Sequence, residues 1–430
     1  METIQAPKGT FDILPYDAEE PWQLTSHWTH FEEVARRTAF EYGYSEIRTP
    51  MFERTELFAR GVGATSDIVT KEMFTFEDRG GRSLSLRPEG TASVMRAFIE
   101  HRLAQARSVH KFFYLAPMFR YERPQSGRYR QHHQFGVEVL GVGLAEQDAE
   151  VIDLLYETYH RLGLNNLTVN LNSVGDTASR ASFRTALQDY LRPHFNALSA
   201  ESRDRFERNP LRILDSKDPQ DKKILVDAPS IINHLTSSAK EHFEQLQRVL
   251  DALKIPYQIN DRIVRGLDYY DKTVFEVTTE NLGAQNALGG GGRYDGLLAT
   301  FGGSDLPGIG FGTGIERVLQ AMVAQDVSIP GKRAPLAYFL PLGEEARAAL
   351  FPFVSQLRHR GVPVEIELHA RKIQAGLQNA IRSLAEFCIL VGSEEIQRNR
   401  AQLKHLAQHS QEEVPLDQLV QIMEERWRKR

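Results

Sequence analysis

Hydrophobic positions recur every three or four residues near the amino terminus, over residues 21–43. Trp28 and Phe31 belong to this repeat, and such spacing places apolar side chains on one face of a helix. Gly43 follows at a position suited to ending that helix. A second helix with the same kind of apolar face is predicted directly after residues 87–91.

The period of the pattern falls to two further along the chain. In residues 134–140 apolar side chains alternate with polar or small ones, so that Gln134 and Glu138 share the polar face. The polar stretch 121–133 separates this strand from an aromatic-rich one at 111–120. The pattern therefore predicts a long antiparallel hairpin, and an antiparallel sheet rather than a parallel dinucleotide-binding one.

Charged, helical sequence without glycine interrupts these strands over residues 177–254. Strand-like sequence lies before it, at 167–171, and resumes after it, at 266–279 and 308–312. The interrupting segment is therefore predicted to be an inserted helical module.

Residues 326–334, with their prolines, glycine and basic pair, are the best candidate for a linker between domains. Beyond them apolar strands alternate with helical stretches, which predicts a compact α/β domain with a parallel or mixed sheet. These predicted strands are 336–340, 362–366 and 387–391. The expected division is a core in two parts, an insertion, a linker and a second domain, at 1–176 and 255–325, 177–254, 326–334 and 335–430 respectively.

Composition narrows the class of protein without identifying it. The chain has 430 residues, 41% hydrophobic and 25% charged, as in ordinary globular proteins of two or three domains. It lacks an apolar stretch long enough to span a membrane, and residues 1–15 do not resemble a signal peptide. The single cysteine, Cys388, excludes an internal disulfide and a multi-cysteine zinc site. We expect a cytoplasmic protein by elimination.

The net charge of −5 weakly opposes a surface specialised for nonspecific nucleic-acid binding. This net charge is compatible with an enzyme that binds RNA through local basic patches. Composition alone decides no further than this.

The predicted hairpin brings three polar side chains together. Arg120 lies at the end of its first strand, and Gln134 and Glu138 share one face of its second. A planar guanidinium at such a position is suited to binding a phosphate through two parallel hydrogen bonds. A solvent-facing sheet explains this pattern equally well when it is taken in isolation.

A second group of candidates follows in residues 265–270. Tyr269 and Tyr270 stand close to Arg265 and a glycine, a combination that can form an aromatic, hydrogen-bonding pocket. Taken alone, these residues are more often ordinary members of a strand.

Glycines form the third pattern. Residues 289–292 are all glycine, and Gly308, Gly310, Gly312 and Gly314 alternate directly before a predicted helix at 314–323. Glycine at every second position of a strand strips one face of side chains, so a flat ligand can lie on the backbone. Arg317 follows in the first turn of the helix, within reach of a terminal phosphate. The spacing matches neither a Walker A loop nor a Rossmann fingerprint, so a nucleotide site here is of another kind.

Together these motifs give the chain a resemblance to the histidyl-tRNA synthetases, a class II aminoacyl-tRNA synthetase family. Phe-Arg-Tyr-Glu-Arg-Pro at 119–124 is similar to motif 2, and the segment 308–318 to motif 3. The helix before Pro50 is similar to motif 1. Arg-Gly-Leu-Asp-Tyr-Tyr at 265–270 and Gly-Gly-Gly-Arg-Tyr-Asp-Gly at 290–296 resemble the two histidine-binding signatures, and residues 87–91 also fit.

The resemblance implies an antiparallel α+β catalytic core, a helical insertion and an α/β anticodon-binding domain. It implies a ligase that activates histidine with ATP and transfers it to tRNA(His), acting as a homodimer with Mg²⁺ on the pyrophosphate side. For ATP it implies that Arg120 and Arg265 act at the α-phosphate and Arg317 at the γ-phosphate, with Gln134 also in the nucleotide site.

For histidine the resemblance assigns the amino and carboxylate groups to Glu89, Thr91 and Gln134. It assigns the two imidazole nitrogens to Glu138 and Tyr270, with Tyr269 as a wall of the pocket. Arg123 and Gln125, in the motif 2 loop, would meet the acceptor end of the tRNA. The neighbouring His132 and His133 are expected to be loop residues rather than metal ligands, because other ligands at suitable spacing are missing.

Two other interpretations remain at this point. A non-catalytic relative that senses histidine in histidine biosynthesis would share much of the pattern, but such relatives tend to lack the anticodon-binding domain and the catalytic arginines. A class II synthetase for another amino acid would share the three class motifs, and the two histidine signatures argue against it.

Overall fold

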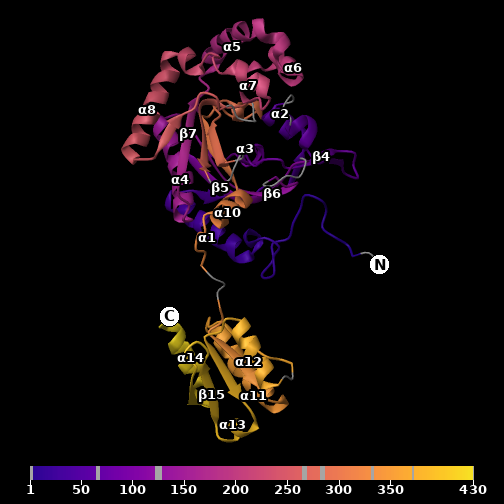
Figure 1. Cartoon of the computed structure of the whole chain (residues 1–430), viewed down its shortest axis with the longest axis vertical. Helices are drawn as coiled ribbons and strands as arrows, with labels where there is room; N and C mark the ends of the chain where they lie inside the picture. Colours follow the sequence, from indigo (N-terminus) through magenta and orange to yellow (C-terminus); the bar gives the residue numbers. More distant parts are fainter. Residues whose placement is uncertain are drawn as a thin grey trace. The chain divides into compact units, whose positions relative to one another are not determined.

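The structure is a computed structural model that describes residues 3–63, 68–121, 128–263, 269–280, 286–330, 334–369 and 372–429. The chain forms two compact units, Met1–Ile329 and Pro330–Arg430 (Figure 1). Each has its own sheet and its own buried apolar clusters. No helix in the described ranges combines the length and the apolar character needed to cross a membrane.

An eight-stranded sheet forms the centre of the first unit. Its order is β1-β5-β6-β11-β10-β9-β7-β8, and its bounds are Ser45–Glu46, His110–Phe119, Gln131–Leu140, Gly308–Gly314, Ala287–Arg293, Asp271–Thr279, Leu167–Ser173 and Tyr257–Ile259. The five pairings from β5 to β7 are antiparallel, and only the outermost strands pair in parallel. The predicted hairpin and mainly antiparallel sheet are therefore confirmed.

One face of this sheet is buried beneath helices. These are α1 (Thr25–Glu41), α4 (Ala145–Arg161) and α10 (Ile315–Ala324), which contact one another and the sheet. Phe135, Val137 and Val139 point into this core, as the alternation predicted, and Trp28 and Phe31 meet them from α1. The first predicted helix is confirmed, with a short 3-10 turn at Pro21–Gln23 before it.

The opposite face of the sheet carries helix α3 (Thr91–Glu100), which begins where the second predicted helix was expected. Beside it lie a small three-stranded sheet, a second helix and three short turns: β2 (Phe52–Arg54), β3 (Thr75–Glu77), β4 (Ser83–Leu86), α2 (Thr55–Val62), η2 (Ile68–Glu72), η3 (Leu103–Gln105) and α9 (Leu297–Thr300). The segment before α3 thus leaves the small sheet and delivers the residues of 87–91 onto the open face of the large one.

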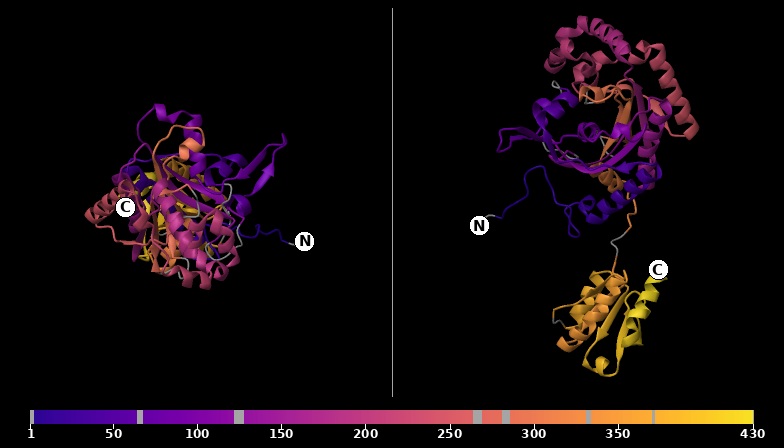
Figure 2. Two further views of the ribbon diagram at one scale, coloured as in Figure 1. Left: turned by 90° about the horizontal axis from the view of Figure 1, so that it is seen from above. Right: turned by 180° about the vertical axis from the view of Figure 1, so that it is seen from behind.

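The segment predicted to be a helical insertion is helical throughout, and Figure 2 shows its helices gathered at one end of the first unit. It contains α5 (Thr177–Leu191), η4 (Arg192–Ala197), α6 (Ala200–Arg208), η5 (Pro210–Asp215), α7 (Pro219–Leu225), η6 (Ile231–His234) and α8 (Ser237–Leu253). The elements before α8 share a separate apolar cluster. Helix α8 instead packs on α4, with Phe243, Leu246 and Leu250 in the main core. The boundaries proposed for this module stay a prediction.

The second unit is a five-stranded mixed sheet of order β13-β12-β14-β15-β16, and the predicted α/β pattern is confirmed. Its elements are β12 (Ala337–Pro341), α11 (Glu344–His359), β13 (Val364–Ile366), α12 (Ile373–Arg382), β14 (Phe387–Val391), α13 (Ser393–Gln397), β15 (Arg400–His405), β16 (Ser410–Pro415), η8 (Leu416–Gln418) and α14 (Leu419–Arg428). The last two strands were not predicted, because they are polar and lie at the antiparallel edge of the sheet.

A buried ion pair fastens the central sheet to the helices behind it. Arg293, at the end of β10, is fully buried and pairs with the equally buried Asp148 on α4. Its Nη1 donates to Asp295 Oδ1 and to the Val142 carbonyl oxygen, and its Nη2 donates also to the Leu144 carbonyl oxygen. His242 on α8 contacts the second oxygen of Asp148 at 2.8 Å. Helices α4 and α8 and strand β10 are thereby held at one point.

Breaking this pair should destabilise the first unit severely. Asp148→Ala leaves the Arg293 guanidinium buried without its partner, and removal of one member of such a pair costs about 3–5 kcal/mol. Burial alone would raise the pKa of Asp148, but the hydrogen bond from His242 and the charge of Arg293 outweigh it and lower that pKa. The contribution should therefore be present above the ordinary carboxyl pKa and be lost as pH falls through the lowered one.

Urea unfolding of the full chain at pH 7 and at pH values from about 4 down to about 2, followed by circular dichroism, measures both effects. Glu244→Gln on α8 is the matched control, because Glu244 forms an exposed pair with Lys240 at 3.9 Å. An Asp148→Ala protein that unfolds at the same urea concentration as the control would contradict the assigned role.

Candidate active site

Glycine residues leave part of the open face of the large sheet without side chains. In register, Gly312 lies between Gly136 on β6 and Gly290 on β10, and Gly310 lies beside Glu138. A Cβ atom at Gly310 would stand 2.3 Å from both Glu138 Oε2 and the Val137 carbonyl oxygen. The alternation read from the sequence thus produces a bare backbone surface, and it lies within paired strands rather than in a flexible loop.

A small cavity of about 90 Å³ opens on this surface. Seven of the residues predicted for the site line it: Glu89, Thr91, Arg120, Gln134, Glu138, Tyr269 and Tyr270. Glu138 is fully buried, and its carboxylate accepts hydrogen bonds from the hydroxyls of Thr91 (2.7 Å), Tyr114 (3.4 Å) and Tyr294. The cavity therefore ends in a carboxylate surrounded by hydroxyl groups.

The electrostatics of this cavity are set by burial. Desolvation raises the pKa of Glu138 to about 8, even though the hydroxyl donors favour its ionised form. Desolvation also raises the pKa of Glu89, whose oxygens accept from the backbone amides of Thr91 (2.7 Å) and Ala92 (2.9 Å). Glu89 thus supports the first turn of α3 in addition to facing the cavity.

Tyr114 and Tyr294 also line this cavity, although no role was predicted for either of them. Tyr294 belongs to the Gly-Gly-Gly-Arg-Tyr-Asp-Gly segment, which could have suggested it, whereas Tyr114 is one aromatic residue among several on β5. Both rings occupy space left by glycine. A Cβ atom at Gly90 or at Gly136 would lie 2.3 Å from Tyr114 Cζ, and one at Gly308 would lie 2.3 Å from the Tyr294 ring.

A second cavity of about 270 Å³ continues along the same face. Arg317, in the first turn of α10 as predicted, donates to the Ala287 carbonyl oxygen at 3.0 Å and lines it. Its other charged and polar lining residues are Arg120, Arg128, Tyr129, His132, Gln134, Glu276 and Glu316. Because it has two predicted arginines and exposed glycine backbone, this cavity is suited to a ligand that carries both a polyphosphate and a flat aromatic ring.

The structure corrects the predicted location of the two neighbouring histidines. His132 and His133 lie on strand β6, which begins at Gln131, and not in the loop that was assigned to 121–133. Desolvation, and then the charge of Arg120, lower the pKa of His132 to about 3, so its ring is neutral. His133 donates from its backbone amide to buried Glu316 at 2.8 Å, and its ring Nδ1 lies 2.9 Å from the same carboxylate. Within the described ranges no cluster of metal-ligating side chains occurs.

The two cavities adjoin. Arg120, Gln134, Gly290 and Gly312 line both of them. Arg120 follows directly on β5, and its Nε donates to the Pro88 carbonyl oxygen at 2.9 Å, which ties it to the segment before α3. A ligand in the small cavity can therefore meet a ligand in the larger one beside the Arg120 guanidinium.

Three predicted residues lie outside the described parts of the chain. Arg265, which was assigned to the α-phosphate, precedes Tyr269 in the gap 264–268. Arg123 and Gln125, assigned to the tRNA, lie in the gap 122–127. Their assignments stay predictions.

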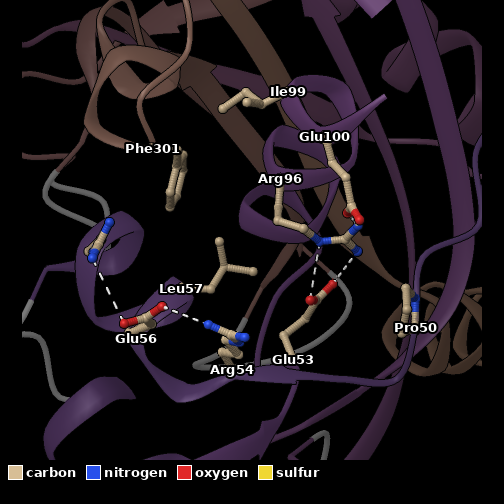
Figure 3. A pocket seen from close by; sticks show the side chains of 10 residues that line it. Pro50, Glu53, Arg54, Glu56, Leu57, Arg96, Ile99, Glu100 and Phe301 are labelled. Atoms are coloured by element: carbon tan, nitrogen blue, oxygen red, sulfur yellow. Dashed lines mark hydrogen bonds and ion pairs between the residues drawn. The ribbon is translucent and has the colours of Figure 1, made fainter. Parts of the chain in front are cut away.

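A larger cavity, of about 570 Å³, is lined mainly by residues of α2 and α3 (Figure 3). Its charged side chains mainly pair with one another: Arg96 binds Glu53 and Glu100, and Glu56 lies within 3.9 Å of Arg54 and Arg60. It shares no lining residue with the two cavities on the glycine face. Size alone therefore does not mark the site, and the convergent chemistry does.

Comparison with known proteins agrees with this location. Residues 9–318 match the family model for histidyl-tRNA synthetase, and residues 337–426 match that for an anticodon-binding domain. A histidine–tRNA ligase of Protochlamydia amoebophila is 54% identical over 96% of this chain and 98% of its own. One from Desulfitobacterium hafniense is 47% identical over 99% of both chains. The crystal structure of apo histidyl-tRNA synthetase from S. aureus has a TM-score of 0.83 at 34% identity, covering 98% of this chain and 100% of its own.

The glycine face can be tested by adding single methyl groups. Gly310→Ala should lower the thermal unfolding midpoint, because its Cβ meets backbone and a buried carboxylate at 2.3 Å and overpacking costs about 1–3 kcal/mol. Gly312→Ala is the control, since its Cβ would meet Gln134 Nε2 at an ordinary 3.5 Å. Scanning calorimetry of both variants checks this, and equal shifts would show that close packing at Gly310 is not the constraint.

Proposed function

The chain belongs to the histidyl-tRNA synthetase family, and we propose that its two adjoining cavities join histidine to ATP in the first step of that family's reaction. The activity is that of a histidine–tRNA ligase, which forms histidyl-adenylate and then transfers the histidyl group to tRNA. A non-catalytic histidine sensor is not favoured, because relatives named histidine–tRNA ligase align over nearly the whole chain and an anticodon-binding domain is present.

The adjoining of the two cavities is the observation that carries this proposal. Adenylate formation requires the carboxylate of the amino acid to attack the α-phosphorus of ATP in line with the departing pyrophosphate. Histidine in the small cavity and ATP in the larger one would place these groups at the shared residues. Most of the rate then comes from positioning and from fixed positive charge, without a side-chain base.

Arg120 is the catalytic group that this arrangement favours. Its guanidinium borders both cavities and is held by the Pro88 carbonyl oxygen, so it is already oriented before the substrates bind. Charge that develops on the α-phosphate would be stabilised there without reorganisation, which is usually the largest contribution in such sites. Arg265 is proposed for the same phosphate and Arg317 for the γ-phosphate at the other end of the larger cavity.

We assign the polar ends of histidine to the mouth of the small cavity. Glu89, Thr91 and Gln134 would receive the ammonium and carboxylate groups, and Tyr269 would form one wall. Glu138 and Tyr270 would bind the imidazole nitrogens. A pocket that satisfies both nitrogens leaves buried polar groups unpaired with any other amino acid, which gives strong discrimination without an editing step.

The remaining components rest on the family and on the chemistry of the donors. Mg²⁺ is proposed to arrive with ATP, held by phosphate oxygens and water with at most one or two carboxylates, of which Glu276 lines the cavity. The second unit is proposed to bind the tRNA anticodon, and Arg123 and Gln125 to meet the acceptor end. A homodimer acting in the cytoplasm is the assembly and location we propose.

Arg120→Ala should lower histidine-dependent exchange of pyrophosphate into ATP by about 10²–10³-fold, as for the loss of one oriented donor to a developing charge. The effect should fall on kcat more than on KM for histidine. Arg203→Ala, at an exposed position of α6, serves as the control and should leave exchange unchanged. Exchange promoted by another amino acid, or unaffected by loss of Arg120, would contradict the proposal.

The division of labour between the two units gives a second test. A chain ending at residue 329 should keep histidine-dependent exchange, because both cavities and their supporting clusters belong to the first unit. Charging of tRNA(His) should fall by at least about 100-fold. Each specifically recognised base typically contributes about 1–3 kcal/mol of binding free energy, and the second unit is proposed to recognise two or more anticodon bases. Undiminished charging by the shortened chain would show that the second unit does not contribute to tRNA recognition.

A further inference from the structure

The Glu138 carboxyl group is buried among neutral hydrogen-bond donors. This carboxyl group ends the small cavity, and its oxygens accept from Thr91, Tyr114 and Tyr294. All three donors are neutral hydroxyls. Among the described residues that line the cavity, Arg120 is the one cation, and it lies beside Glu89 and bonds to Pro88. Within the described lining, Glu138 thus has hydrogen-bond partners but no opposite charge of its own.

Apart from Arg120, the titratable side chains in the described lining are carboxyl groups and phenols. Glu89, before α3, adds a like charge that disfavours ionisation of Glu138. Tyr114 on β5, Tyr269 and Tyr294 are phenols whose own pKa values are raised well above the usual range by burial, so they stay neutral. Strand β11 contributes only Gly310, Phe311 and Gly312 to the cavity.

The charges of bound histidine can be compared with those of the side chains that line the small cavity. Histidine brings an ammonium, which Glu89 complements, and a carboxylate, which would be received by Thr91 and Gln134 near the positive charge of Arg120. Nothing is left in the described lining to balance an ionised Glu138. An uncompensated buried charge is costly, and the ring of the substrate is the one remaining group able to take or give a proton near neutral pH.

We propose, on the basis of the function assigned above, that Glu138 and the imidazole ring are bound as a pair of zero net charge, so that the site selects histidine by proton count as well as by shape. The pair is either a carboxylic acid with a neutral ring or a carboxylate with an imidazolium. One proton moves along the hydrogen bond between these two states, and none is gained or lost by the pair.

Tyr294 is the positioning residue of this pair. It is adjacent in the chain to Arg293, which the buried bond to Asp148 holds in place, and its hydroxyl donates to Glu138 Oε2. That bond fixes the carboxyl group and favours its ionised form, so Tyr294 influences both where the proton acceptor stands and how strongly it holds a proton.

Proton linkage follows from the pKa of Glu138, about 8, and that of a free imidazole, about 6.5. At about pH 7 the free enzyme holds the proton on Glu138 and free histidine has a neutral ring, so binding should take up no proton. Above the pKa of Glu138 the free enzyme has lost that proton, and binding should take up about one. Affinity for histidine should then fall about tenfold per pH unit.

Isothermal titration of the full-length protein with histidine, in pairs of buffers that differ in ionisation enthalpy, counts these protons. We expect no uptake at about pH 7 and, at about pH 9, one proton more than for Glu138→Gln, which corrects for the amino group of histidine. Release at pH 7 would mean a neutral ring on a carboxylate, and no excess at pH 9 would mean that the carboxylate binds the ring without a proton; either result overturns the proposal. Uptake of one proton at pH 7 would support the pair and would mean that Glu138 is already ionised in the free protein.

Tyr294→Phe tests the positioning role without relying on Glu138→Gln. Loss of the donor should raise the pKa of Glu138, so the onset of proton uptake should move to higher pH, and affinity at pH 7 should fall about tenfold. Tyr159→Phe is the matched control, because its buried hydroxyl bonds Thr313 from the core side and should leave the onset unmoved. An unmoved onset in Tyr294→Phe would reduce Tyr294 to packing. Histidine-dependent exchange, measured alongside, tests the proposed function separately from the proton count.

Discussion

The buried ion pair between Arg293 and Asp148 is the interaction on which the site depends most. It joins β10 to α4, and through His242 it also secures α8, the helix that closes the insertion against the core. Two unlike charges in a dry interior hold their geometry strictly, because any separation leaves each of them unsolvated. The next residue in the chain is Tyr294, so the position of the pair is transmitted by one peptide bond to the end of the small cavity.

The same sheet serves two opposite demands. Its rear face carries close-packed apolar side chains such as Phe135 and Phe311 against the helices, and its front face is stripped by glycine. Tyrosine rings then fill part of the cleared space, which is why Gly90, Gly136 and Gly308 tolerate no Cβ atom without a shift of a neighbour. The result is a cavity lined mainly by hydroxyl and carboxyl groups, beside a second cavity whose lining includes three arginines, Arg120, Arg128 and Arg317.

Several side chains that line the two cavities also form structural hydrogen bonds. Glu89 supports the first amides of α3, Glu316 fastens α10 to β6 through His133, and Arg120 is tied to the backbone before α3. Such double duty preorganises the site, because the groups are oriented before a ligand arrives. It also explains how segments distant in the chain, 87–91, 114–138 and 290–317, come to share one surface.

The sequence by itself determined the strands of the hairpin, the polar face with Gln134 and Glu138, the helix after residues 87–91 and the glycine alternation, because each follows from a short-range period. Through motifs it also indicated most of the polar residues that line the two cavities. Only the tertiary structure decided that Tyr114 and Tyr294 surround Glu138, that His132 and His133 belong to a strand, and that α8 packs on α4. Those features arise from long-range packing and burial, and neither the register between distant strands nor the desolvation of a carboxyl group is encoded in local spacing.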